Sequence, residues 1–109
     1  MTELELSLAR CFRTKLEEGL GSRFLRLRAF GSRARGISRP DSDFDLLVLV
    51  DRVDSETRRK VADWASDVMM ESDEFLCLSP LVMDPERLTR LSQRERLLAR
   101  DIESDGVEL

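Results

Sequence analysis

Residues 31–50 read GSRARGISRPDSDFDLLVLV, a loop followed by an apolar run with two carboxylates at its start. The run LLVLV is apolar on both faces of an extended strand, which predicts a central strand of a sheet over residues 43–50. Asp43 and Asp45 are two residues apart, so in a strand both point to the same face. Charge at the edge of an apolar core requires solvent or a cation to compensate it. The stretch therefore predicts a buried strand with a site at its mouth.

The spacing of apolar residues on either side of this stretch predicts the remaining elements. They are a helix over 3–20, a strand over 23–30, a helix over 55–71 capped by Asp54 or Ser55, a strand over 74–83 and a helix from 85 to about 104. Pro80 interrupts the third strand, which favours a sheet edge or a bulge. The order α-β-β-α-β-α predicts a small α+β domain, with helices packed on a mixed sheet. A chain of 109 residues suffices for one domain, residues 1–109.

The strand over 23–30 is expected to be half-buried. Leu25, Leu27 and Ala29 alternate with Arg26 and Arg28, so one face is predicted to be apolar and the other basic and exposed. This basic face and the interrupted third strand are both available for contact with a second copy, so a homo-oligomer stays an alternative.

Composition indicates which broad class of protein this chain belongs to. With 41% hydrophobic and 37% charged residues the chain is expected to be globular, and a net charge of −4 argues against a nucleic-acid binder. It has no apolar run near the roughly 20 residues of a membrane span and no start typical of a signal peptide, so we expect a cytoplasmic location.

Cysteine and histidine usage narrows the chemistry further. Cys11 and Cys77 lie among apolar residues and are expected to be buried, reduced thiols. Histidine is absent, which excludes Ser-His and Cys-His nucleophiles and His-containing zinc sites. Any metal is therefore expected to be a hard cation on oxygen ligands.

The loop before the central strand has the composition of a phosphate-binding turn. Gly31 lets the backbone approach a ligand closely, and backbone N–H groups with the Ser32 hydroxyl can hold phosphate oxygens. Arg33 is a candidate to neutralise a triphosphate, together with Arg35 and Arg39, although a solvated basic loop is the alternative for any one of them. Singly, these residues also fit a plain turn or a cap. Together with two carboxylates suited to Mg²⁺ or Mn²⁺, they favour a nucleotide site.

Gly31-Ser32, ten intervening residues, and Asp43-x-Asp45 leading into an apolar strand resemble the signature of the minimal nucleotidyltransferases of the DNA polymerase β superfamily. The resemblance implies Mg²⁺-dependent transfer of a nucleoside monophosphate from an NTP, expected to be ATP, to a hydroxyl. It implies that Asp43 and Asp45 are the catalytic metal ligands and that Gly31, Ser32 and Arg33 bind the nucleotide.

The resemblance also implies a partner. Small proteins of this family occur as antitoxins paired with a helical HEPN protein encoded nearby, and such antitoxins can adenylylate a tyrosine of the toxin. This chain contains no tyrosine, so it cannot be adenylylated on a tyrosine of its own.

The family usually carries a third carboxylate on the third strand, and here the sequence departs from the pattern. The expected position falls near Ser79, and Glu74 can substitute only if the strand shifts. A serine hydroxyl is a poor Mg²⁺ ligand. Three hypotheses follow. The chain is a transferase acting on a partner protein, or a catalytically weakened nucleotide-binding module that acts by binding its partner. The third hypothesis is a nucleotide-binding subunit of a larger enzyme.

Overall fold

The apolar run of residues 44–50 forms the second strand, β2 (Phe44–Val50), inside a four-stranded mixed sheet of order β3-β2-β1-β4. It pairs antiparallel with β1 (Phe24–Phe30) and parallel with β3 (Leu78–Met83), and β4 (Val107–Glu108) adds antiparallel to β1. The central position predicted for β2 is confirmed. The computed structural model describes residues 1–36, 42–74, 76–94, 96–104 and 106–109.

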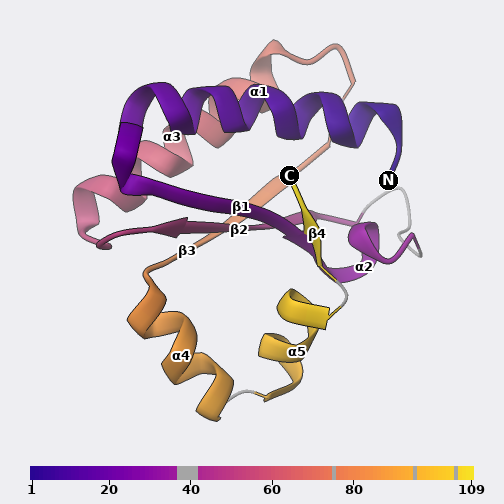
Figure 1. Ribbon diagram of the computed structural model, residues 1–109. Helices are drawn as coiled ribbons and strands as arrows, with labels where there is room; N and C mark the ends of the chain where they lie inside the picture. The colour runs from indigo at the N-terminus through magenta and orange to yellow at the C-terminus, as the bar shows by residue number, and fades with distance from the viewer. Residues whose placement is uncertain (37–41, 75, 95, 105) are drawn as a thin grey trace.

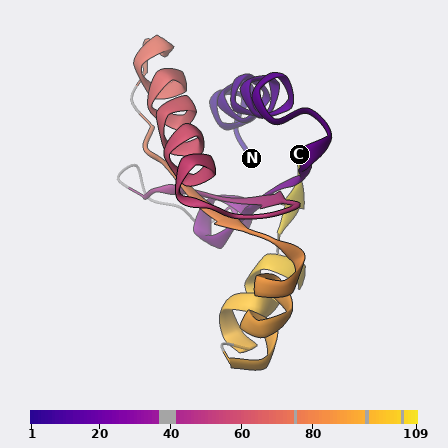
Figure 2. The same cartoon turned by 90° about the vertical axis from the view of Figure 1, so that its left-hand side faces the viewer.

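Helices cover both faces of the sheet. α1 (Glu3–Leu20) and α3 (Ser55–Glu71) lie on one face, and α4 (Pro85–Arg94) and α5 (Arg96–Ser104) lie on the other (Figures 1 and 2). A single 3-10 turn, η1 (Gly21–Arg23), joins α1 to β1, and the short α2 (Gly31–Ala34) follows β1. This arrangement confirms the predicted α+β class. None of the described helices has the length and apolar character needed to cross a membrane.

Two apolar clusters form because the side chains of β2 alternate between the faces of the sheet. The larger cluster lies under α1 and α3 and includes the fully buried Phe12, Leu16, Leu27, Phe44, Leu46, Val48 and Val61. The smaller cluster lies under α4 and α5 and contains Phe30, Leu47, Met83 and Ile102. Asp45 precedes Leu47 by two residues, so it belongs to the face that α4 and α5 cover.

β1 departs from simple alternation. Leu27 and Ala29 are buried as predicted, but Leu25 is 48% exposed, so its placement on the same face was wrong. The pairing register shifts between Phe24 and Arg26, whose partners on β2 are consecutive residues. Leu25 is thus the extra residue of a β-bulge, and a bulge resets which side chains face the core.

α1 confirms the helix predicted over 3–20. Thr2 and Glu5 form a capping box, in which each side chain accepts a hydrogen bond from the other residue's backbone N–H. Cys11, predicted to be buried, is exposed. The buried stripe runs through Leu8, Phe12 and Leu16, and Cys11 lies off it, on the solvent side of the helix.

α3 has the predicted bounds, and Asp54 caps it by accepting a hydrogen bond from the N–H of Thr57 at 2.7 Å. β3 begins at Leu78 rather than at residue 74, so the predicted strand was too long at its start. Its position at the sheet edge, which Pro80 favoured, is confirmed.

The helix predicted from 85 to 104 is two helices, α4 and α5, which pack against each other (Figure 1). A straight helix of this length would extend about 30 Å and carry its second half away from the sheet. Folding back brings Leu98 and Ile102 of α5 onto the same cluster as Leu88 and Leu91 of α4. Burial of apolar side chains from both halves therefore accounts for the break.

The segment after α5 returns to the sheet as β4, which the sequence did not predict. Arg28 donates hydrogen bonds to the carbonyls of Ile102 and Gly106, and it forms an ion pair with Glu108 at 3.1 Å. Its side chain is only 14% exposed. The expectation of an exposed basic face was therefore wrong at Arg28, because α5 and β4 cover it; Arg26 remains 45% exposed.

Candidate functional site

The two candidate carboxylates lie at the start of β2. Asp43 is exposed and immediately precedes the strand, and Asp45 is half-buried within it. Burial raises the pKa of Asp45 above its ordinary value, and the charge of Asp43 raises this pKa further. The second effect is the repulsion between two carboxylates when both are ionised. A cation between them would relieve both the burial cost and the repulsion.

Gly31 brings the turn after β1 directly against Asp45. Its φ of +76° lies in the left-handed region, and a Cβ built there would stand 2.5 Å from Oδ2 of Asp45. Only glycine fits such an approach without displacing the carboxylate. Ser32 follows in the same turn, at the start of α2. The structure thus brings the phosphate-turn candidate Gly31 against the candidate metal ligand Asp45, with Ser32 next to Gly31 in the chain.

Arg33 has a different environment from the one a phosphate ligand needs. Its side chain is 10% exposed; Nε donates to the carbonyl of Ser42 at 2.9 Å, and Nη1 lies 3.3 Å from Oε2 of Glu5, which is 3% exposed. Burial alone raises the pKa of Glu5, but hydrogen bonds from Thr2 and Arg33 hold it below its ordinary value. Arg33 therefore holds residue 42, next to Asp43, against α1. A role for it in nucleotide binding stays a prediction.

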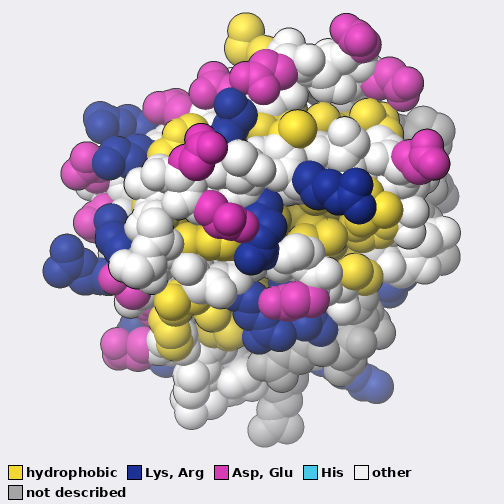
Figure 3. Space-filling view, turned by 45° about the horizontal axis from the view of Figure 1, so that its top comes forward, with side chains coloured by type: hydrophobic (Ala, Val, Ile, Leu, Met, Phe, Trp, Pro, Cys, Tyr) yellow, Lys and Arg dark blue, Asp and Glu magenta, His cyan; other side chains and the backbone are white. Residues whose placement is uncertain are grey.

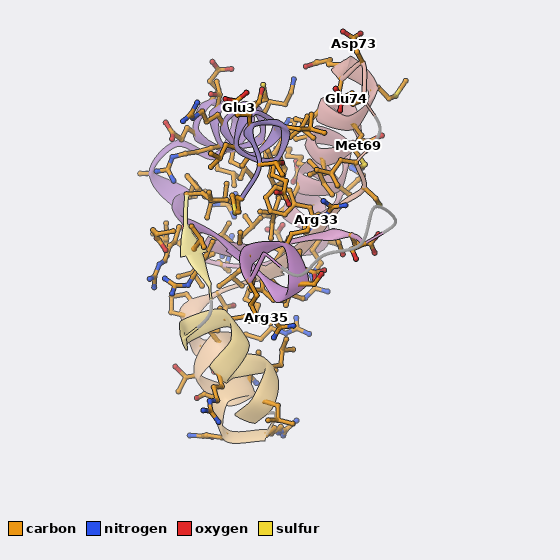
Figure 4. All side chains as sticks on the ribbon, turned by 90° about the vertical axis from the view of Figure 1, so that its right-hand side faces the viewer. Glu3, Arg33, Arg35, Met69, Asp73 and Glu74 are labelled. Carbon is orange, nitrogen blue, oxygen red and sulfur yellow. The ribbon has the colours of Figure 1, made fainter. Side chains whose placement is uncertain are left out.

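The other arginines of the loop contribute less to the described site. Figure 4 shows Arg33 on the side of α2 that faces α1 and Arg35 on the opposite side, toward α4 and α5. Arg35 is exposed. Arg39 lies outside the described residues.

Ser79 occupies the position beside Asp45 on β3. The parallel register pairs Asp45 with Ser79 and, on the other side, the antiparallel register pairs Asp45 with Phe30. Asp73 and Glu74 are exposed and lie near the end of α3, away from α2 (Figure 4). Glu74 thus does not replace Ser79, because β3 starts four residues after it.

Two residues near the site were not identified from the sequence. Cys77 was expected to be a buried thiol; it is half-buried beside Asp43, and its pKa is raised by burial first and then by the Asp43 carboxylate. Only the parallel pairing of β2 and β3 brings it there. Glu5 had a partial signal, because Thr2-x-x-Glu5 is a capping-box pattern, but that pattern does not reveal its ion pair with Arg33.

The donor set fits a hard divalent cation. Among residues placed by the structure, no group of three or more His, Cys, Asp and Glu is arranged to hold a metal. Two carboxylates with mutual repulsion suit Mg²⁺, which retains several waters and accepts phosphate oxygens. Asp43 and Asp45 would therefore share the ion with a bound nucleotide.

Comparisons with known proteins identify the family and support the fold. No curated protein matches the chain. Among solved structures, one chain of "Crystal structure of the toxin-antitoxin with AMP-PNP" matches with a TM-score of 0.54 and 20% identity, covering 89% of this chain and 68% of that one. At that identity the match supports the fold alone. The family model described as "Nucleotidyltransferase domain" matches residues 13–104, which include both the Gly-Ser turn and the Asp-x-Asp strand. The chain therefore belongs to the nucleotidyltransferase domain family.

Proposed function

We propose that the chain binds an NTP, most simply ATP, with Mg²⁺ and transfers its nucleoside monophosphate to a hydroxyl of a partner protein. The observation that carries the proposal is the contact between the two halves of the site. The Gly31 turn, which we propose holds phosphate oxygens, approaches Asp45 so closely that a Cβ would stand 2.5 Å from its carboxylate. A metal on Asp45 would therefore adjoin a triphosphate held by this turn.

The residues of the chain have separable roles in this proposal. Asp43 and Asp45 hold the cation, which when bound neutralises charge on the α-phosphate and on the departing pyrophosphate. The backbone N–H groups and the Ser32 hydroxyl orient the triphosphate. The acceptor oxygen bonds to the α-phosphorus while the bond to pyrophosphate breaks, and the hydroxyl proton passes to solvent. No histidine is required as a base in this scheme.

The partner is proposed to be a helical HEPN-type protein encoded nearby, with this chain as the antitoxin of the pair in the cytoplasm. The similar solved structure, a toxin–antitoxin with AMP-PNP, supports both an adenine nucleotide and a protein partner. Because this chain has no tyrosine, a tyrosine acceptor has to be supplied by the partner.

A second candidate function is a nucleotide-binding module that acts on its partner by contact. One observation favours it: Ser79, a neutral side chain, is paired with Asp45 where a third carboxylate is expected. Without that carboxylate a second, nucleophile-activating metal has a weak site, and turnover is slow.

Incubation with α-labelled ATP, Mg²⁺ and the product of the neighbouring gene separates the two functions. The transferase transfers label to the partner, and Asp43→Asn with Asp45→Asn abolishes the transfer. A stable complex without label, unaffected by the double substitution, supports the binding module instead. Isothermal titration measures the Mg²⁺-ATP affinity. If the wild type and the double variant bind equally well, the metal site that both candidate functions require is contradicted.

A further inference from the structure

A groove of about 920 Å³ runs along the outer edge of β3, between α3 and α4. Figure 2 shows these two helices flanking that edge from opposite faces of the sheet. The walls combine apolar side chains of α3, β3 and α4 with four exposed arginines, Arg58, Arg87, Arg90 and Arg94. The groove is thus both apolar and strongly basic.

This positive charge is largely uncompensated. Among the described residues of the lining, Asp84 is the one acid, and its Oδ1 already accepts a hydrogen bond from the backbone N–H of Arg87 at 2.7 Å. Within the described part of the chain, Arg90 is the only groove arginine with an ion pair, an exposed contact to Glu86 at 3.8 Å. The side of the molecule over α1 differs, because acidic and basic side chains are interspersed there (Figure 3). In a chain of net charge −4, the groove is a local reversal of sign.

The outer edge of β3 does not suit the addition of another strand. The N–H of Leu78 points away from β2 and donates to Sδ of Met69 at 3.3 Å. Pro80, two residues further along the strand, presents its nitrogen to the same side and has no N–H to donate. An added strand needs a run of free edge donors. The occupant of the groove therefore binds through its side chains.

We propose that this groove docks an acidic amphipathic segment of the partner protein. Carboxylates of such a segment meet the four guanidinium groups, and its apolar side chains meet the apolar walls. A nucleic acid would supply phosphates but no apolar side chains, and the net negative charge of the chain repels it. The proposal rests on the proposed function in one respect: the docked partner is taken to be the protein that accepts the nucleoside monophosphate. The groove starts at Pro80, one residue along β3 from Ser79, which is paired with Asp45.

A synthetic helix-forming peptide with leucine on one face and glutamate on the other is the probe, with binding followed by fluorescence anisotropy. We expect Arg87→Gln with Arg94→Gln to weaken binding about fivefold or more, since two ion pairs are lost. The matched control is Arg10→Gln with Arg59→Gln, two exposed arginines outside the groove, and it should change the affinity less than about twofold. A peptide with glutamine in place of glutamate should bind worse than the acidic one.

Three binding results would overturn the proposal: no binding of the acidic peptide, equal binding by the groove variant, or tighter binding of an oligo-dT strand than of the peptide. A photo-reactive group on the peptide should crosslink to the walls of the groove, which lie within residues 53–62 and 80–94 and at Leu98. Crosslinks elsewhere would also contradict the proposal. Fluorescence of Trp64 during thermal unfolding verifies that each variant is folded.

The same variants separate this proposal from the nucleotide site. Arg87→Gln with Arg94→Gln should leave Mg²⁺-ATP affinity unchanged, whereas Asp43→Asn with Asp45→Asn should leave peptide affinity unchanged. Absence of ATP binding by the wild type contradicts the proposed function and leaves the docking groove standing; absence of peptide binding contradicts the groove alone.

Discussion

The two strands that flank β2 bring very different groups to Asp45. On the β1 side, a Cβ on Gly31 would contact the carboxylate, and Arg33 joins the backbone of Ser42 to Glu5 of α1 through a hydrogen bond and a buried ion pair. On the β3 side, the residue paired with Asp45 is Ser79, with Pro80 next to it.

The difference separates two tasks that a nucleotidyltransferase combines. The β1 side has the close backbone approach and the buried ion pair that, on the proposed function, would help to position a triphosphate. The β3 side lacks the charge that would hold a second cation at an attacking hydroxyl. We therefore expect nucleotide binding to be robust and transfer to be slow.

The largest effect on Mg²⁺-ATP affinity should come from Asp43 and Asp45, the candidate metal ligands at the start of β2. Asp43→Asn with Asp45→Asn is expected to lower Mg²⁺-ATP affinity about a thousandfold, because loss of both ligands costs more than loss of a residue that only supports a ligand. Isothermal titration measures this, with Ser79→Ala as the control that should bind ATP nearly as the wild type does. A comparable loss in Ser79→Ala would contradict the asymmetry between the two sides.

Glu5→Gln should lower the free energy of unfolding by about 2 kcal/mol, since a buried, charge-assisted contact between Glu5 and Arg33 is replaced by a weaker one to a neutral amide. Glutamine retains the capping box, so the change isolates the ion pair. Urea unfolding followed by Trp64 fluorescence gives the value. Glu17→Gln removes an exposed pair with Arg13 on the same helix and should cost less than about 0.5 kcal/mol.

The same variant carries a pH test. The pKa of Glu5 is held below its ordinary value of about 4.5, so the folded state favours the ionised carboxylate. Its contribution to stability is present above that pH and is lost as the pH falls through the lowered pKa. Glu5→Gln should therefore flatten the acid limb of the stability curve, and an unchanged acid limb would contradict the assigned role of the ion pair.

Gly31→Ala should reduce both stability and Mg²⁺-ATP affinity, the affinity by about tenfold, because the new Cβ displaces the Asp45 carboxylate. Gly36→Ala is a matched control: its φ of +74° imposes the same backbone strain, of roughly 1–2 kcal/mol, but no atom of the described residues lies within 4 Å of its Cβ. Both variants should lose stability, and only Gly31→Ala should lose affinity. Equal affinities would show that the contact with Asp45 has no bearing on the nucleotide.

The smallest expected effect is a gain. Ser79→Asp restores a carboxylate beside Asp45 and should raise the rate of label transfer about tenfold, equivalent to about 1.4 kcal/mol in the barrier. Without Mg²⁺ the variant should be less stable than the wild type, because a third negative charge joins the pair. Ser79→Asn, similar in size and uncharged, should give neither change. A rate equal to that of Ser79→Asn would mean that the missing acid does not limit transfer.

Much of the architecture could be predicted from local patterns. The helix over 55–71, the helix over 3–20 and the central strand follow from apolar spacing, since burial of a regular stripe dominates their stability. The errors fall where a residue's environment depends on non-local pairing. Leu25 is exposed because of a bulge in its pairing with β2, Arg28 is covered by the returning β4, and the predicted last helix folds back to reach the sheet.

For the site, the sequence alone identified the candidates for binding phosphate and a hard cation, namely the Gly-Ser turn and the Asp-x-Asp strand in a chain without histidine. Only the tertiary structure decided which of them meet. Sheet register puts Ser79 beside Asp45, close packing puts Gly31 against the same carboxylate, and a buried ion pair joins Glu5 to Arg33, 28 residues away in sequence. The physical reason is that residue chemistry is local, whereas pairing register and the burial of charge depend on elements that are distant along the chain.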